Sequence, residues 1–148
     1  MKAGAATSKP IPSKSLQQLA KRLRAHLEKM AERGVPITYH DLAKVLLLTP
    51  PNTIHKVTEA LELLMDEDTG AGRPLIAAIA ISKARGGLPA PGFFDCAARL
   101  ERFVGDVTGP EAWAFHAREF HAAVAFWGAS GSSNNDKLKD WQSVVRRA

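Results

Sequence analysis

The feature that most constrains the fold is a pair of short amphipathic helical patterns joined by a proline turn. The first pattern covers Tyr39–Leu46 and the second covers about 50–66, with the turn at 49–52 between them. Thr38 has N-cap chemistry for the first helix, and Asp41 stands three residues later, as in a capping box. Because proline cannot continue a helix, the turn separates the two. This order predicts a helix-turn-helix.

The second helix is expected to begin with Thr49 as its N-cap and Pro50 at its first position, where a missing N–H has no cost. The apolar residues of its inner face recur at spacings of three and four, as in an α-helix: Ile54, Val57, Leu61, Leu64 and Met65. The opposite face carries Asn52, Thr53, His55 and Lys56 near the N-terminus, with Glu59 beyond them. That end of the second helix meets base edges in a helix-turn-helix, so these four residues are predicted to contact bases or nearby phosphate.

Further elements are predicted on both sides of this pair. Ser13 can cap a helix that runs to about Arg33, with one apolar face formed by Leu16, Leu19, Leu23, Leu27 and Met30. The apolar run at 75–81 has the length of a strand, although its alanine and leucine also suit a buried helix. The Gly- and Pro-rich segment at 82–92 is typical of a wing. Its cations, Lys83 and Arg85, are expected to reach DNA.

Two helical patterns follow the expected wing. One covers Phe93–Phe103, and a longer one begins at Pro110 with a stripe of Trp113, His116 or Ala117, Phe120, Val124 and Trp127. The predicted fold is therefore mostly α with a small β element, an α+β winged helix-turn-helix with an added N-terminal helix and added C-terminal helices. We expect a disordered basic tail at 1–12, one domain at 13–128, and a flexible linker with a short basic segment at 129–148.

The net charge of +5 is unevenly spread along the chain. Residues 1–33 carry eight Lys/Arg and two acids, whereas residues 34–72 carry two Lys/Arg and six acids. The segment from 129 adds four cations and two acids. Basic flanks around an acidic centre indicate contact with a polyanion through the flanks, although a solvated surface is an equally reasonable interpretation of the first helix. Its predicted phosphate contacts are Lys21, Arg22 and Arg24.

Other classes of function find little support in the sequence. The single cysteine, Cys96, rules out a disulfide framework within one chain and suits a reducing, cytoplasmic compartment. No apolar run approaches the ~18 residues of a membrane span. A signal peptide has an apolar segment after its positively charged start, and the N-terminal lysines here are not followed by one. The five histidines show no metal-ligand spacing with Cys96. We therefore expect no metal, no cofactor and no enzymatic activity, and leave the oligomeric state open.

The segment Ile37-Thr38-Tyr39-His40-Asp41-Leu42-Ala43 resembles the V-x-T-Y-G-x-I-A opening of the DNA-binding domain in alkylguanine-DNA alkyltransferases and alkyltransferase-like proteins. The order of elements is similar over about 34–94. The resemblance implies that Thr38 and Tyr39 contact backbone phosphate, and it places His55 at the family's nucleotide-flipping arginine. It also places Ala80-Ile81-Ser82-Lys83 at the Pro-Cys-His-Arg motif, so Ile81 replaces the alkyl-accepting cysteine.

Two functional hypotheses follow. The first is a non-enzymatic protein that binds double-stranded DNA, as a transcriptional regulator or a nucleoid-associated protein. The second is a protein-interaction adaptor that uses the same fold without nucleic acid. In the second hypothesis, Trp141 and the C-terminal segment form the docking peptide.

Overall fold

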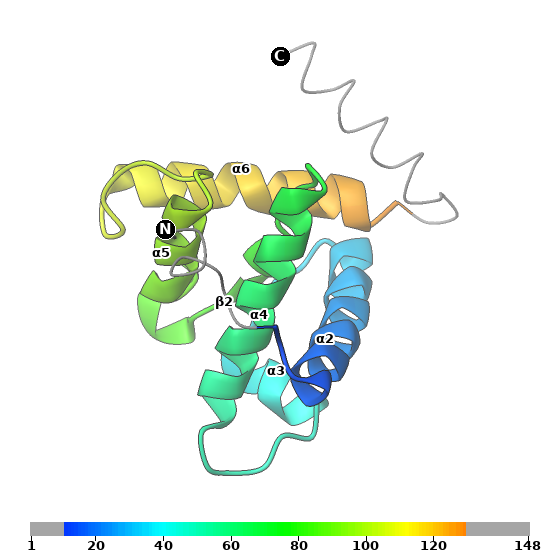
Figure 1. Ribbon diagram of the computed structural model, residues 1–148. Helices are drawn as coiled ribbons and strands as arrows, with labels where there is room; N and C mark the ends of the chain where they lie inside the picture. The colour runs from blue at the N-terminus through cyan, green and yellow to red at the C-terminus, as the bar shows by residue number, and fades with distance from the viewer. Residues whose placement is uncertain (1–10, 130–148) are drawn as a thin grey trace, which may run out of the picture.

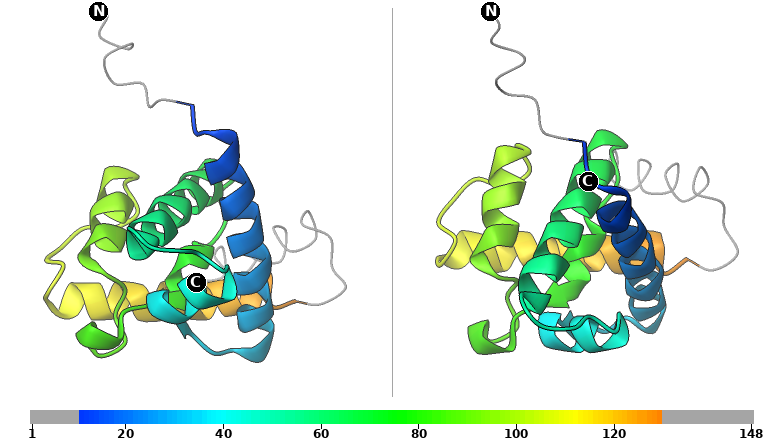
Figure 2. Two further views of the ribbon diagram at one scale, coloured as in Figure 1. Left: turned by 90° about the horizontal axis from the view of Figure 1, so that it is seen from below. Right: turned by 60° about the horizontal axis from the view of Figure 1, so that its bottom comes forward.

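The computed structural model describes residues 11–129 and is mostly helical (Figure 1). The long helices α2 (Lys14–Arg33) and α4 (Thr53–Gly70) lie side by side, and α6 (Pro110–Trp127) runs across them, as both views of Figure 2 show. The short helices α3 (Tyr39–Val45) and α5 (Pro91–Arg99) complete the α-helical part. The prediction of a mostly α fold with a small β element is confirmed.

The N-terminal helix forms as predicted, because its sequence supplies a cap at each end. Ser13 Oγ accepts a hydrogen bond from the backbone N–H of Leu16, and Gly34 ends the helix in the left-handed conformation, with φ of 70°. The apolar face predicted for this helix points inward. Leu23 and Leu27 are fully buried, while the other members of the face are half-buried.

The sheet consists of two short strands, β1 (Ile37–Thr38) and β2 (Ala80–Ile81), which pair in parallel. The apolar run at 75–81 was predicted as one strand, but most of it forms the 3-10 helix η1 (Ile76–Ile79). This short helix is fully buried and packs against α2, α4 and α6, so it lies at the centre of the core. A short apolar run that is buried on every side has the same pattern in a strand and in a helix, which explains why the run alone misidentified the element.

The stripe predicted for the last long helix lies only partly on its core side, since Trp127 is buried and Phe120 and Val124 pack against the core. Trp113 is 50% exposed, and the buried positions of α6 are Ala112, Phe115, Glu119, Ala123, Phe126 and Trp127. Apolar residues lie on two sides of this helix, so the spacing of apolar residues does not identify the core side. The aromatic rings of Phe93, Phe94, Phe103 and Phe115 pack together between α5 and α6.

Candidate nucleic-acid interface

The turn between α3 and α4 and the N-terminal end of α4 form the candidate site, at the bottom of the molecule in Figure 1. The chain leaves α3 through Leu47, with φ of 58°, and passes a cis Pro50–Pro51 peptide bond to Asn52, with φ of 62°. Helix α4 begins at Thr53 and ends at Gly70, so the predicted start with Thr49 and Pro50 is wrong. The left-handed turn at Asn52 delays the start by three residues and extends the loop.

The four residues predicted on the outer face of α4 do come together at its N-terminus. Asn52 and His55 are exposed, while Thr53 and Lys56 are half-buried. No side chain of residues 11–129 caps this helix. Its first backbone N–H groups and the positive end of its dipole therefore suit an anion. His55 Nε2 lies 3.1 Å from Glu59 Oε1, and Lys56 Nζ lies 3.5 Å from the carbonyl oxygen of Thr49.

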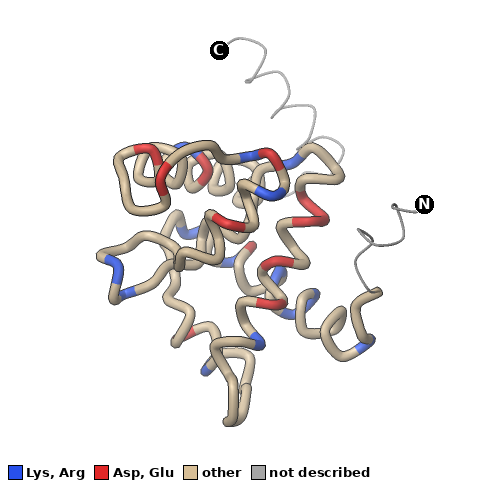
Figure 3. The backbone as a smooth tube through the Cα atoms, turned by 60° about the vertical axis from the view of Figure 1, so that its left-hand side comes forward, with Lys and Arg blue, Asp and Glu red and all other residues tan. Residues whose placement is uncertain are grey.

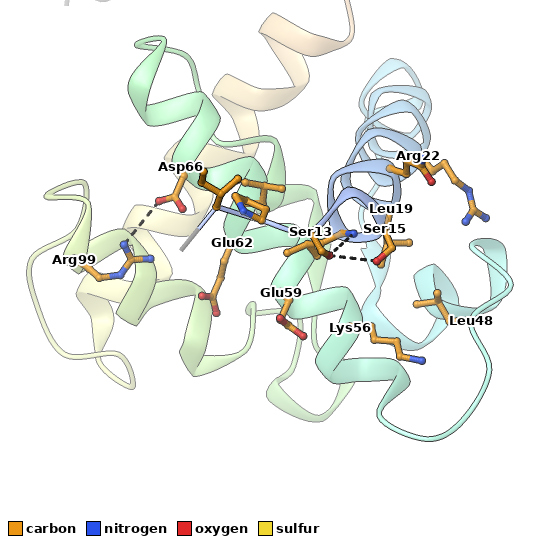
Figure 4. Close-up of a pocket in the computed structure, with 15 residues that line it drawn as sticks. Ser13, Ser15, Leu19, Arg22, Leu48, Lys56, Glu59, Glu62, Asp66 and Arg99 are labelled. Carbon is orange, nitrogen blue, oxygen red and sulfur yellow. Dashed lines mark hydrogen bonds and ion pairs between the residues drawn. The ribbon is translucent and has the colours of Figure 1, made fainter. Parts of the chain in front are cut away.

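Beyond its first turn, the exposed side of α4 is acidic. Glu59, Glu62 and Asp66 line a groove of about 1050 Å³ between α4 and the N-terminal half of α2, with Leu16, Leu19, Leu48 and Leu63 as its apolar lining (Figure 4). Lys56 and Arg22 lie toward the α3–α4 turn, and Arg99 forms an ion pair with Asp66 at 3.8 Å. A row of carboxylates repels phosphate, so this side of α4 does not suit contact along the length of a DNA groove.

Two residues predicted to contact phosphate from the start of α3 have other roles. Thr38 is the N-cap of α3, and its Oγ1 accepts a hydrogen bond from the backbone N–H of Asp41 at 3.1 Å. Tyr39 is only 8% exposed, and its hydroxyl accepts a hydrogen bond from the backbone N–H of Ala90 at 2.7 Å. Burial raises the pKa of Tyr39 to about 12. The predicted phosphate contact of Tyr39 is therefore wrong for this structure, because the ring belongs to the core.

The segment expected to be a wing is not a β-hairpin. It contains the 3-10 helix η2 (Lys83–Arg85) and then leads into α5. Lys83 is exposed, as a DNA contact would require. Arg85 instead turns inward and donates hydrogen bonds to the carbonyl oxygens of Pro89 at 2.6 Å and Val107 at 2.9 Å. The prediction that Arg85 reaches DNA is therefore wrong, since its guanidinium holds two loops together.

The three predicted phosphate contacts of α2 also separate into two groups. Lys21 and Arg22 are exposed, and Arg22 donates a hydrogen bond to the carbonyl oxygen of Leu46 at 2.7 Å, beside the α3–α4 turn. Arg24 is half-buried, pairs with Glu67 and Asp68, and lies 4.8 Å from the ring centroid of Trp127. Arg24 is therefore a structural residue, contrary to prediction. The basic surface is also divided, because both signs of charge are spread along the described chain (Figure 3).

No sequence pattern predicted the buried ionic centre. Asp68 is fully buried and accepts hydrogen bonds from Arg73 and from the backbone N–H of Ile76. Glu119 is also buried; it pairs with Arg102 at 2.8 Å and accepts a hydrogen bond from the backbone N–H of Leu75. Burial raises the pKa of both carboxyl groups, and the nearby arginines oppose that shift. These acids hold η1 in place and are not positioned for chemistry at the surface.

The described residues were also compared with what a metal site, a reactive thiol or a membrane span would require. Within residues 11–129, no group of three or more His, Cys, Asp or Glu side chains is placed to hold a metal ion. Cys96 lies on α5 and is 3% exposed. His116 lies 2.8 Å from the carbonyl oxygen of Ala78, and burial lowers its pKa. In the same part of the chain, none of the helices combines the length and apolarity needed to cross a bilayer.

Comparisons with known proteins identified no relative of this chain. No protein-family profile matches the chain, and no curated protein sequence or solved structure is significantly similar to it.

Proposed function

We propose that the protein is a non-enzymatic DNA-binding protein that grips duplex DNA with the α3–α4 turn and the N-terminal end of α4. The observation that carries the proposal is the exposed N-terminus of α4, which lacks a side-chain cap and gathers Asn52, Thr53, His55 and Lys56 around it. Backbone N–H groups at a helix N-terminus bind phosphate, and nearby polar side chains reach base edges.

The charges around α4 define how DNA would approach. Glu59, Glu62 and Asp66 follow the N-terminal end of α4 on its exposed side. Because these carboxylates repel phosphate, α4 meets the duplex with its N-terminal end. Arg22 lies beside the α3–α4 turn through its hydrogen bond to Leu46, and Lys21 precedes it on exposed α2 surface. These two cations neutralise phosphate without reading sequence. The proposed interface therefore consists of the end of one helix, the turn before it and one basic flank.

A relationship to the alkyltransferase-like proteins is part of this proposal. Its support is the order of a short strand, α3, the turn, α4, β2 and a Gly/Pro-rich loop at 82–92, with that loop in place of the wing. Ile81 lies in β2. The resemblance places this residue at the alkyl-accepting cysteine, so the proposed protein holds DNA without alkyl transfer. We propose a cytoplasmic location on the nucleoid, as a regulator of transcription or a nucleoid-associated protein.

The test is binding of a labelled duplex by fluorescence anisotropy at about 50 mM and about 200 mM salt. The double variant His55→Ala/Lys56→Ala should bind more weakly, and the slope of log affinity against log salt should fall by about one for each lost phosphate contact. The control is Lys29→Ala, which removes one exposed cation from the distant half of α2. Equal loss in the control, or no loss in the double variant while it remains folded, would overturn the proposal.

A protein-interaction adaptor is the second candidate, and one observation favours it. Apolar side chains are exposed at the α3–α4 turn, where Leu47 is 81%, Val45 46% and Ile54 41% exposed. A cluster of exposed apolar residues often marks a protein contact. If the parent protein shows no salt-dependent affinity for any duplex, the adaptor becomes the better function, and Leu47→Ser should then abolish capture of the partner while leaving the fold intact.

A further inference from the structure

Helix α6 carries a second apolar stripe, which is partly exposed and lies beside the face that forms the core. Trp113 is 50% exposed, Ala117 is exposed, and Phe120 and Val124 are half-buried. Their spacings of four, three and four residues keep them on one side of an α-helix, whose period is ~3.6 residues. The core side of the same helix is formed by Ala112, Phe115, Ala123 and Phe126. This outer stripe includes Phe120 and Val124, which also pack against the core, and it leaves Trp113 and Ala117 exposed.

Helix α6 runs along one edge of the molecule, with α2, α4 and α5 on one side of it (Figure 1). Its main packing partners are η1 and α2. The exposed parts of Trp113 and Ala117 form apolar surface that a further amphipathic helix would cover, since burial of apolar area favours association.

The chain that follows α6 has the length and pattern to return along it. Residues 128–135 read GASGSSNN, which is typical of a flexible linker. Residues 136–148 then place Leu138, Trp141 and Val145 at spacings of three and four. A helix of that length spans ~20 Å, and the stripe from Val124 back to Trp113 spans ~17 Å. Connections of two to about eight residues join antiparallel helices.

We propose that residues 136–148 dock as an antiparallel helix on the outer stripe of α6 in the same chain. Leu138 then lies beside Val124, Trp141 beside Phe120 and Val145 beside Ala117. The antiparallel direction carries the Arg146–Arg147 end toward Glu111 in the first turn of α6. A short linker gives the segment a local concentration in the millimolar range, above that of a second copy at micromolar protein. The contact requires no nucleic acid and stands apart from the proposed function.

Disulfide trapping in the full chain tests the contact. The variant His121→Cys/Gln142→Cys pairs an exposed position beside the stripe with a position beside the apolar face of the segment. Native Cys96 is buried and does not interfere under folded conditions. The control is Lys44→Cys/Gln142→Cys, whose exposed partner lies on α3, at the opposite end of the molecule (Figure 1). We expect the α6 pair to form an intramolecular disulfide at least about tenfold more readily in a glutathione buffer.

A second change to the segment separates docking from chance collision. Adding Leu138→Ser and Trp141→Ser should reduce trapping of the α6 pair to the control value. The core of residues 11–129 does not contain these positions, so the variant retains a folded reporter. Equal trapping of the two pairs, or trapping that persists after both serine changes, overturns the proposal. Disulfide-linked dimers as the main product also overturn it, because a second copy would then cover the stripe.

Discussion

Arg24 of α2 and Asp68 of α4 form an ion pair in the interior, with Nη1 and Oδ1 2.9 Å apart. Asp68 is fully buried, and the same carboxylate oxygen accepts hydrogen bonds from Arg73. The pair joins α2 to α4. It also explains why a cation in a basic sequence segment is not available to phosphate.

Replacement of Asp68 by asparagine should lower the free energy of unfolding by about 3–5 kcal/mol, because it removes the fully buried carboxylate that pairs with both Arg24 and Arg73. Urea denaturation followed by circular dichroism measures the change. The control is Glu67→Gln, which removes the exposed carboxylate that also pairs with Arg24. Exposed pairs contribute about 0–1 kcal/mol, so a similar loss in both variants would contradict the structural role of Asp68.

Tyr39 is the single tyrosine, and its hydroxyl should ionise only near its raised pKa of about 12. In the unfolded chain the same group ionises near its ordinary pKa of 10.0. The unfolded state therefore gains from ionisation first, and stability falls as the pH rises between these values, by up to about 1.4 kcal/mol per pH unit. Absorbance titration at alkaline pH measures the pKa directly. Ionisation near the ordinary value in the folded protein would contradict the burial of Tyr39.

Truncation of two apolar residues of α4 should change the free energy of unfolding by very different amounts. Leu61 is 5% exposed, so Leu61→Ala should lower the free energy of unfolding by about 2–5 kcal/mol through the cavity it leaves. Ile54 is 41% exposed, so Ile54→Ala should change it by less than about 1 kcal/mol. Urea denaturation of the two variants measures both changes in the free energy of unfolding. A large loss at Ile54 would mean that the turn is folded against the core.

Incubation with duplex DNA that carries a labelled alkylguanine should leave the protein unlabelled. Ile81 has no nucleophile, and the thiol of Cys96 is buried with Arg99 Nη2 3.2 Å from its Sγ atom. Mass spectrometry of the intact chain measures transfer. Stoichiometric labelling, above all at Cys96, would contradict both the buried position of this thiol and the proposal of DNA binding without chemistry.

Local signals explain the parts of the fold that the sequence predicted. Ser13 and Thr38 cap their helices as expected, and the regular spacing of Leu23 and Leu27 identified the inner face of α2. Each of these features depends on residues within one or two helical turns. A cap or an amphipathic face is therefore readable without knowledge of the tertiary contacts.

The incorrect predictions arose where distant contacts decide the outcome. Arg24, Tyr39 and Arg85 looked like surface contacts, but their partners lie far along the chain, at Asp68, Ala90 and Val107. The start of α4 depends on the left-handed turn at Asn52, which proline chemistry alone does not predict. Of the candidate site, the sequence located the polar end of α4, but not the side chains that the fold directs inward.

The pairing of β1 with β2 has a consequence for the local unfolding of the protein. Ile37 and Ala80 are register partners although 43 residues separate them, and both α3 and α4 lie within the closed segment. Closing such a segment has an entropic cost that only its packed contacts offset. The pair should therefore form late and break early, and α3, the turn and α4 should exchange their amide hydrogens as one cooperative unit. The surface proposed to meet DNA would then be present as a whole or absent as a whole.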